Sequence, residues 1–234
     1  MLFDILIAGL RVRIEHRYDE VKTRCADYIV LTEGTPDAVI SATDEQLRWA
    51  WDLEKIPAPE AEFYCVHRHL YAQLPQYDAF WIHGCAVEMN GSVYIFTARS
   101  GYGKTTHARL WLKAFGEKAR VINGDNPLIR LIDERFIAYG TPFGGKEGYN
   151  VNTSAPLKGI CYLTHEDENS IRKMDPQMAY AQILRDSYRY MNEENSELWM
   201  KLLEQFVQKV PVYQLCCNQD VEAAYVAYEG MKNG

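Results

Sequence analysis

The chain has 234 residues, of which 47% are hydrophobic and 24% are charged, and its formal net charge is −7. This length and composition are ordinary for a globular protein that can bury a sizeable core. The acidic balance and the lack of any cluster of Lys and Arg argue against nucleic acid as a partner.

The longest apolar stretches are far shorter than the roughly 20 residues that span a bilayer. The first ten residues also lack the basic start of a signal peptide. We therefore expect a cytoplasmic protein without a membrane partner. The six cysteines show no CxxC pair and no histidine-linked metal spacing, which favours reduced, apolar thiols.

The first part of the chain predicts a small β-rich unit. Alternation around Gly9 indicates two strands that meet at a tight bend, and Thr43 is a suitable cap for a helix. The two prolines in residues 55–60 indicate a linker, so we predict a β-rich N-terminal cap over 1–58 and a second domain over 59–234. The predicted elements of the cap are strands within 3–16, at 27–32 and at Ala38–Ser41, and a helix over 44–53.

The second part predicts an α/β domain with a mixed sheet. Apolar residues at helical spacing indicate a helix over 60–74. Asn90-Gly91 predicts a hairpin that joins a strand over 79–88 to the strand Ser92–Thr97. The remaining predicted elements are strands at 121–124, 128–132, 135–139, 159–165 and 212–217, and helices over 106–118, 175–191, 195–210 and 219–231.

The run Ala98-Arg99-Ser100-Gly101-Tyr102-Gly103-Lys104-Thr105 lies between a predicted strand and a predicted helix. In this context, Gly101 and Gly103 let successive N–H groups point at an anion, and the helix dipole adds positive potential there. Lys104 supplies a cation for the outer phosphates, and the Thr105 hydroxyl can ligate Mg²⁺. Ala98 replaces the first glycine of the strict motif. The run predicts a nucleoside triphosphate site.

Four further residues carry groups that phosphoryl transfer could use. Asp125 follows a strand and is expected on the same rim of the sheet as the loop, unless it only forms a turn. His83 is predicted in mid-strand, as either a core histidine or an active-site group. Lys146 and Glu147 lie in the glycine-rich loop 140–148, where they would contact phosphate and metal or occupy a solvated turn.

Together these residues resemble the catalytic domain of HPr kinase/phosphorylase, a bacterial serine kinase related in fold to the core of ATP-dependent phosphoenolpyruvate carboxykinase. The resemblance covers about 60–163 and rests on His83-Gly84, the loop Ser100–Thr105 and Asp125. It implies a P-loop α/β fold, with a mixed β-sheet core flanked by helices, and ATP and Mg²⁺ as cofactors. It also implies that Asp125 is the general base and that His83 assists it.

From these arguments we predict three sets of site residues. The catalytic residues are Asp125, His83 and Lys104. The nucleotide-binding residues are Ser100, Gly101, Tyr102, Gly103, Lys104, Thr105, Thr106 and Lys146. The metal ligands are Thr105, Asp125 and Glu147.

The sequence departs from the family pattern in three places. Gly124 stands where the family has the first of two adjacent aspartates, and Gly144-Gly145-Lys146-Glu147 is only a positional counterpart of the family's arginine–glycine signature. The N-terminal part does not resemble the regulatory domain of the full-length enzyme. The chain is similar instead to short HPr-kinase-like proteins, some of which phosphorylate a serine in a small peptide.

We therefore interpret the sequence as an ATP- and Mg²⁺-dependent kinase whose acceptor is a hydroxyl, preferably serine in a peptide or small protein. A small-molecule or carboxykinase-like phosphotransferase is one alternative. A nucleotide-binding module without catalysis is another, which Ala98 and Gly124 keep open. A homo-oligomer is compatible with the sequence.

Overall fold

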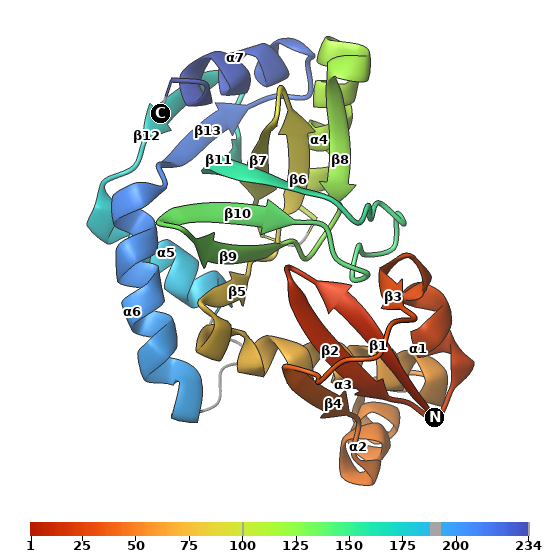
Figure 1. The fold of residues 1–234 in the computed structure, drawn as a ribbon. Helices are drawn as coiled ribbons and strands as arrows, with labels where there is room; N and C mark the ends of the chain where they lie inside the picture. Colours follow the sequence, from red (N-terminus) through yellow and green to blue (C-terminus); the bar gives the residue numbers. More distant parts are fainter. Residues whose placement is uncertain (100, 188–192, 234) are drawn as a thin grey trace.

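A computed structural model describes residues 1–99, 101–187 and 193–233, apart from the side chains of residues 53, 54 and 194. The N-terminal unit is a four-stranded sheet in the order β3-β1-β2-β4, with helices α1 to α3 next to it (Figure 1). Its elements are β1 (Leu2–Ile7), β2 (Leu10–Glu15), α1 (Asp19–Arg24), a 3₁₀ turn (Ala26–Tyr28), β3 (Ile29–Val30), β4 (Ala38–Ser41), α2 (Asp44–Glu54) and α3 (Ala58–Gln73).

Local signals in this unit are confirmed where they involve neighbouring residues. The β1–β2 hairpin turns at Ala8 and Gly9, whose φ angles are 51° and 77°. Thr43 and Gln46 form a capping box at the start of α2, because each side chain bonds the other residue's backbone N–H. The strand predicted over 27–32 is wrong for most of its length. A 3₁₀ turn extends to Tyr28, and only Ile29 and Val30 form a strand. The short helix α1 was not predicted.

The larger unit is built on a nine-stranded mixed sheet in which seven strands follow the order β5-β9-β10-β11-β7-β6-β8. The other two strands branch from β11: β13 pairs with β11, and β12 pairs with β13. The strands are β5 (Ala79–Trp81), β6 (Cys85–Met89), β7 (Ser92–Thr97), β8 (Ala119–Asn123), β9 (Leu128–Ile132), β10 (Arg135–Tyr139), β11 (Ser154–His165), β12 (Ser170–Lys173) and β13 (Val212–Cys217). The helices are α4 (Lys104–Phe115), α5 (Pro176–Ser187), α6 (Glu193–Lys209) and α7 (Glu222–Met231), with 3₁₀ turns at Leu74–Tyr77 and Gly116–Lys118. The predicted mixed sheet with flanking helices is thus confirmed.

The pairing directions bring several strand ends to one edge of this sheet. Strand β11 runs parallel to β7 and β13, and β8 runs in the same direction as β7 because both are antiparallel to β6. The carboxyl ends of β7, β8, β11 and β13 therefore share one edge. In open α/β sheets, ligands bind at such an edge.

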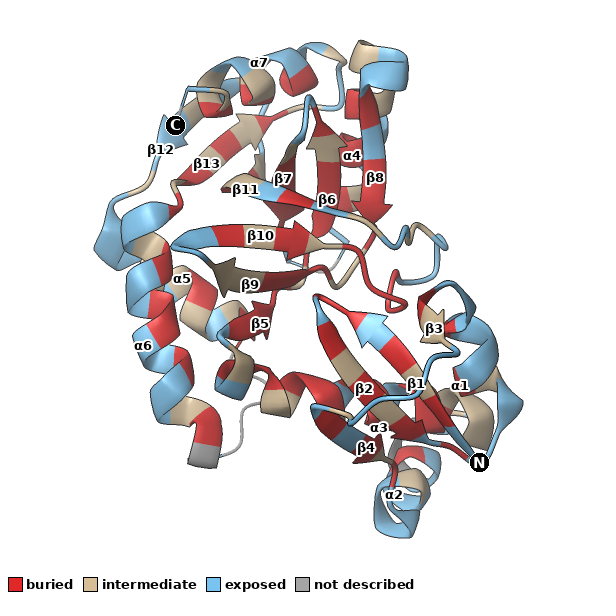
Figure 2. Cartoon of the chain, in the orientation of Figure 1, coloured by how far each residue is buried: buried red, intermediate tan, exposed pale blue. Residues whose placement is uncertain are grey.

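Alternating side chains of the central strands serve two separate cores. Ile95 and Ile160 pack with α5 and α6, whereas their neighbours Phe96 and Cys161 pack with α4 and α7. Figure 2 shows the buried residues concentrated on the strands and on the inward faces of these helices. Helix α4, which follows the glycine loop, is held by the buried indole of Trp111.

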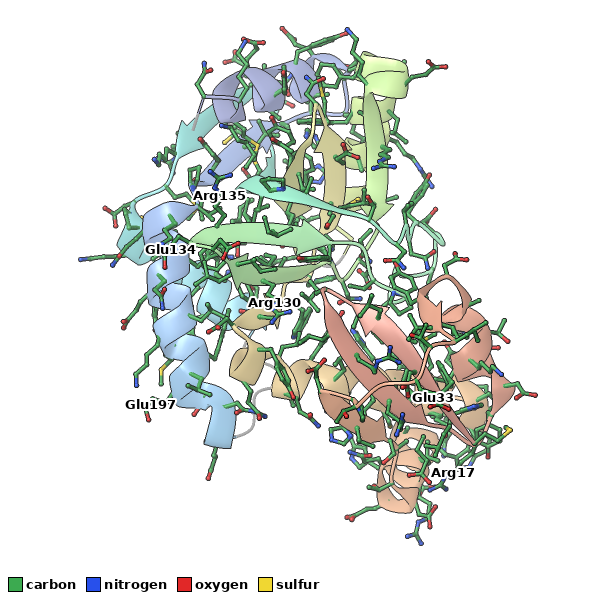
Figure 3. The ribbon with its side chains drawn as sticks, in the orientation of Figure 1. Arg17, Glu33, Arg130, Glu134, Arg135 and Glu197 are labelled. Atoms are coloured by element: carbon green, nitrogen blue, oxygen red, sulfur yellow. The ribbon has the colours of Figure 1, made fainter. Side chains whose placement is uncertain are left out.

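A third core joins the N-terminal unit to the larger one. It contains Phe63 and Tyr71 of α3 together with Leu128 and Phe143 of the larger unit. Arg130 adds a polar link, because its guanidinium donates to the carbonyls of Ala8 at 2.7 Å and Tyr77 at 3.1 Å (Figure 3). The boundary at 58/59 remains our proposal for the division of the chain, although it falls at the start of α3, which packs with α1, α2 and β4 of the N-terminal unit.

Several predicted boundaries of the larger unit need correction. The strand predicted over 79–88 is two strands, β5 and β6, with different partners. Helix α4 begins at Lys104 and ends at Phe115, and β11 begins five residues earlier than predicted. Helix α5 ends at Ser187, and the predicted continuation over 188–191 lies outside the described residues. Strand β12 was not predicted.

Within the described residues, no helix has both the length and the apolar character needed to cross a bilayer. All six cysteines are free thiols. Cys217 is buried and Cys216 is half-buried, as expected for neighbours on a strand.

Candidate functional site

The glycine loop connects the end of β7 to the start of α4. Gly101 and Gly103 have φ angles of 81° and 82°, a conformation that side chains other than glycine rarely adopt. Gly103 is the N-cap of α4, and no side chain among the described residues caps it. The N–H groups of the first helical turn therefore remain available to an anion. Ser100, which the sequence also assigns to this site, lies outside the described residues.

Lys104 is buried at the start of α4. Its side chain is only 9% exposed, and Nζ donates to the carbonyl oxygen of Ala98 at 3.4 Å. Burial lowers the pKa of Lys104, and the negative charge of Asp125 opposes this effect. Within the described residues, the ammonium of this buried lysine makes one long hydrogen bond, which suits an anionic ligand. Of the two threonines that follow, Thr105 is half-buried and Thr106 is exposed.

His165 supports the loop from the neighbouring strand. It is the last residue of β11, and its Nε2 lies 3.2 Å from the carbonyl oxygen of Tyr102. Its ring also meets the Tyr102 ring edge-on at 5.5 Å. We did not predict this residue, although its position at the end of the predicted strand 159–165 was a usable signal.

Asp125 and His83 form a carboxylate–imidazole pair at the same edge. His83 Nε2 lies 3.1 Å from Asp125 Oδ1. The backbone N–H of Gly84 donates to the Asp125 carbonyl at 2.8 Å, and Thr97, at the end of β7, donates its hydroxyl to the His83 carbonyl at 2.7 Å. These bonds tie the segment before β6, the end of β7 and the segment after β8 to one another.

His83 is therefore not in mid-strand, as the sequence suggested. It lies in the break between β5 and β6, where residues 82–84 belong to neither strand. The break frees the imidazole from the sheet and allows it to face Asp125. Gly84 is required here because a Cβ would lie 2.8 Å from Ile95 Cγ2 and 3.1 Å from the Phe96 carbonyl oxygen.

The turn that carries Asp125 is held by Asn123. The buried Asn123 Oδ1 accepts hydrogen bonds from the N–H groups of Asp125 at 2.9 Å and Asn126 at 2.7 Å. Its amide nitrogen donates to the hydroxyl of Thr141 at 2.9 Å. Asn123 is therefore the residue that forms the turn, which leaves the Asp125 side chain to face His83.

Asp125 is ionised at neutral pH. Burial raises the pKa of its carboxyl group, but the hydrogen bond and charge of His83 and the charge of Lys104 lower it more, so the net pKa lies below the ordinary value of 3.8. A half-buried carboxylate whose charge interacts with that of a buried lysine is typical of functional sites.

The glycine-rich loop 140–148 packs directly on this turn. A Cβ at Gly145 would lie 2.8 Å from Asp125 Cβ, and one at Gly124 would lie 2.7 Å from the Gly144 carbonyl oxygen. Gly124, which replaces an aspartate of the family pattern, thus permits a close backbone contact. A carboxylate there would need the loop to move.

Replacement of Gly124 by aspartate is expected to lower the free energy of unfolding by about 1–3 kcal/mol, because the new side chain overpacks a backbone contact. Denaturant unfolding measures this effect, and Gly124→Ala separates the added Cβ from the added charge. An equally stable Gly124→Asp protein would show that the aspartate side chain does not crowd the loop.

Lys146 and Glu147 are both exposed in this loop and point to different neighbours. Glu147 Oε2 accepts from Arg109 Nη2 of α4 at 2.6 Å. Lys146 lines a groove formed with α2 and α3. Among the described residues, no three His, Cys, Asp or Glu side chains form a group that could hold a metal ion. The metal-binding role of Glu147 stays a prediction.

His67 and His107 are buried histidines outside this pair. His67 stacks on Phe143 at 4.2 Å, and His107 accepts from the Trp111 indole N–H at 3.2 Å. Burial lowers the pKa of each to about 3. Between pH 6.5 and 3 the unfolded chain therefore binds more protons than the folded one, and stability falls as the pH falls.

We expect acidification from pH 7 to pH 5 to cost roughly 2 kcal/mol of unfolding free energy for each of these histidines. His67→Phe, which preserves the ring stacking, should remove about half of this loss. Urea titrations at pH 5, 6 and 7 measure the effect. An unchanged pH slope in the variant would show that His67 is not buried in its neutral form.

A cleft of about 380 Å³ lies beside the glycine loop. Its lining includes Ala98, Arg99 and Tyr102 of the loop, Thr164 near the end of β11 and Arg185 of α5. The cleft thus opens at the same sheet edge as the loop.

No protein-family model and no curated protein matches the chain. Among solved structures, a similar chain is the Hpr(Ser) kinase/phosphatase from Coxiella burnetii, with a TM-score of 0.39 and 11% sequence identity. The alignment covers 65% of this chain and 88% of that chain. Neither a shared family nor a shared activity follows from a likeness at this level.

Proposed function

We propose that the chain is a kinase that uses ATP and Mg²⁺ to phosphorylate a hydroxyl group, preferably that of a serine in a peptide or small protein. One observation carries the proposal: the Asp125–His83 pair and the buried Lys104 share one sheet edge with a helix N-terminus that no side chain of the described residues caps. Phosphoryl transfer requires a general base, a cation that pairs with the phosphates and a loop that binds anions.

The loop residues fit a polyphosphate chemically. The uncapped N–H groups at the start of α4 would bond phosphate oxygens, and Lys104 would pair with the outer phosphates. The Thr105 hydroxyl and the Asp125 carboxylate would hold Mg²⁺, which prefers oxygen ligands. The cleft beside Arg99 and Tyr102 offers space for the nucleoside at the edge where α/β sheets bind ligands.

When bound, Mg-ATP supplies an electrophilic γ-phosphorus and ADP as the leaving group. Asp125 accepts the proton of the acceptor hydroxyl as the hydroxyl oxygen bonds to the γ-phosphorus and the bond to the β–γ bridging oxygen breaks. His83 is a positioning residue that holds the carboxylate toward the acceptor. Lys104 stabilises the negative charge that develops on the phosphates of the leaving ADP. We also place the protein in the cytoplasm, where its free thiols remain reduced.

Two measurements test this proposal. Calorimetry with Mg-ATP and Mg-ADP should detect binding, and radiolabelled ATP should label serine-containing peptides more than free serine, glycerol or oxaloacetate. Absence of any nucleotide binding would overturn the proposal. Tight ATP binding with no transfer to any acceptor would instead identify a binding module without catalysis.

A further inference from the structure

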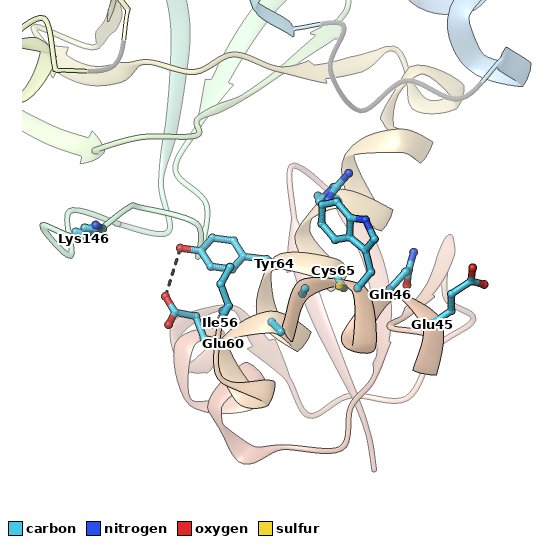
Figure 4. A pocket seen from close by; sticks show the side chains of 11 residues that line it. Glu45, Gln46, Ile56, Glu60, Tyr64, Cys65 and Lys146 are labelled. Atoms are coloured by element: carbon cyan, nitrogen blue, oxygen red, sulfur yellow. Dashed lines mark hydrogen bonds between the residues drawn. The ribbon is translucent and has the colours of Figure 1, made fainter. Parts of the chain in front are cut away.

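A groove of about 610 Å³ lies between α2 and α3. Helix α2 contributes Glu45, Gln46, Trp49 and Ala50, which have the spacing of a single helix face. Helix α3 contributes residues with the same spacing, among them Glu60, Tyr64 and Arg68, and Lys146 of the glycine-rich loop completes one end. We call this feature the helix groove, and Figure 4 shows it from close by.

The helix groove is tied to Asp125 through the opposite face of α3. On that face, the His67 ring stacks on Phe143 at 4.2 Å and the Phe63 ring meets it at a tilt at 5.0 Å. The Phe143 carbonyl accepts from the amide of Asn126, next to Asp125. On the groove side, burial raises the pKa of Tyr64, with further contributions from the Glu60 and Asp125 carboxylates. Gly145, the neighbour of the groove-lining Lys146, packs on Asp125, since a Cβ at Gly145 would lie 2.8 Å from Asp125 Cβ. The Lys146 end of the groove therefore lies beside the turn that carries the proposed base.

The charges of the helix groove differ between its two ends. Lys146 stands at the end near Tyr64 and Glu60, whereas Glu45 stands at the far end (Figure 4). Trp49 lies one turn after Glu45 on α2 and is 45% exposed, and the Arg68 guanidinium carbon lies 5.7 Å from the centroid of its ring. The groove thus offers an exposed indole on the α2 wall and a carboxylate at the end farther from Lys146, while the Glu60 carboxylate lies at the Lys146 end.

This order of groups matches an extended peptide better than a small hydroxylated molecule. A small acceptor would need space only at Asp125, whereas the groove extends from Lys146, which follows the Gly145 that abuts Asp125, along two helices. A net charge of −7 also attracts basic segments over longer distances.

We propose that the helix groove binds the acceptor of the reaction proposed above, as an extended peptide that places a serine hydroxyl at Asp125, an apolar side chain on Trp49 and a basic side chain at Glu45. This inference rests on the proposed kinase function. It adds the place where a peptide acceptor binds and its flanking-residue preference, and it assigns the N-terminal unit to substrate selection.

The test uses an array of nonapeptides with serine at the centre and alanine elsewhere. Leucine is placed at one flanking position and lysine or glutamate at a position farther from the serine on the same side. Binding of the fluorescently labelled full chain is measured without ATP, and labelling is measured with radioactive Mg-ATP. We expect peptides with leucine and lysine to bind and react best.

Two variants with matched controls make the test specific. Glu45→Lys should reverse the preference from lysine to glutamate, whereas Asp52→Lys, the same change at an exposed position of α2 outside the groove lining, should not. Trp49→Ala should raise the KM for the best peptide at least tenfold, with ATP affinity and ATP hydrolysis in water unchanged. Trp51→Ala removes an exposed indole from the same helix and should leave this KM unchanged.

The outcomes separate the groove from the kinase function. Three results would overturn the groove assignment without affecting the kinase proposal. These are an unchanged lysine preference in Glu45→Lys, equal effects of the two charge variants, and transfer only to free serine or glycerol. A preference that reverses in the binding array, with no ATP binding by calorimetry, would support the peptide site and overturn the kinase proposal.

Discussion

Replacement of Lys104 by methionine is expected to weaken ATP binding about 10- to 100-fold, because a hydrogen-bonded charge contact to phosphate is lost. Phosphoryl transfer should fall by about 10³-fold or more, since the same ammonium balances charge on the departing phosphate. Isothermal calorimetry and transfer from radiolabelled ATP measure the two losses. Lys113→Met is the matched control, because Lys113 is an exposed lysine in the last turn of the same helix.

The stability of the Lys104→Met protein provides an independent check. Burial disfavours the charged form of Lys104, so methionine should keep or raise the melting temperature while it removes function. A variant that loses ATP binding only because it unfolds would show a lower melting temperature. A variant that binds ATP as tightly as the original chain would contradict the role of Lys104.

Replacement of Asp125 by asparagine is expected to reduce transfer about 10²- to 10⁴-fold and to change ATP affinity far less. Asparagine has nearly the size of aspartate but cannot accept the acceptor's proton. In the original chain, the lowered pKa of Asp125 keeps the base ionised from neutral pH down to below pH 3.8. Protonation of the Asp125 carboxylate should therefore not reduce the transfer rate between pH 5 and 8. Asp125→Ala should lose transfer in the same way.

The control for Asp125 is Asp133→Asn, an exposed aspartate in the β9–β10 turn whose left-handed backbone asparagine also tolerates. Full turnover by Asp125→Asn would show that Asp125 is not the base. A parallel loss of Mg-ATP affinity would show that the carboxylate acts mainly through the metal. His83→Gln should lower transfer less than Asp125→Asn does, because His83 positions the carboxylate without taking the proton.

Much of the fold could be predicted where the signal is local. The Asn90-Gly91 turn predicted the β6–β7 hairpin because both residues adopt positive φ angles, 53° and 73°. The strand–loop–helix order around Gly103 was likewise readable from neighbouring residues. The predicted strand over 79–88 failed because the break at His83 depends on hydrogen bonds from Thr97 and to Asp125, which lie far along the chain.

Parts of the site escaped prediction for the same reason. His165 reaches the loop only because β11 runs parallel to β7, and Glu147 meets Arg109 across 38 positions of sequence. Nothing in the local pattern of α2 and α3 indicates that their outer faces form a groove near Asp125. That groove exists because Phe143 packs against the inner face of α3.

The amino-acid sequence by itself determined the glycine loop, the capping box at Thr43 and the residue types available for chemistry, because each depends on groups a few positions apart. Tertiary structure alone decided that Asp125 faces His83, that Gly124 must lack a side chain and that the N-terminal helices approach the site. These arrangements depend on the pairing directions of the strands and on the close packing of distant side chains. Such contacts leave no periodic trace in the sequence.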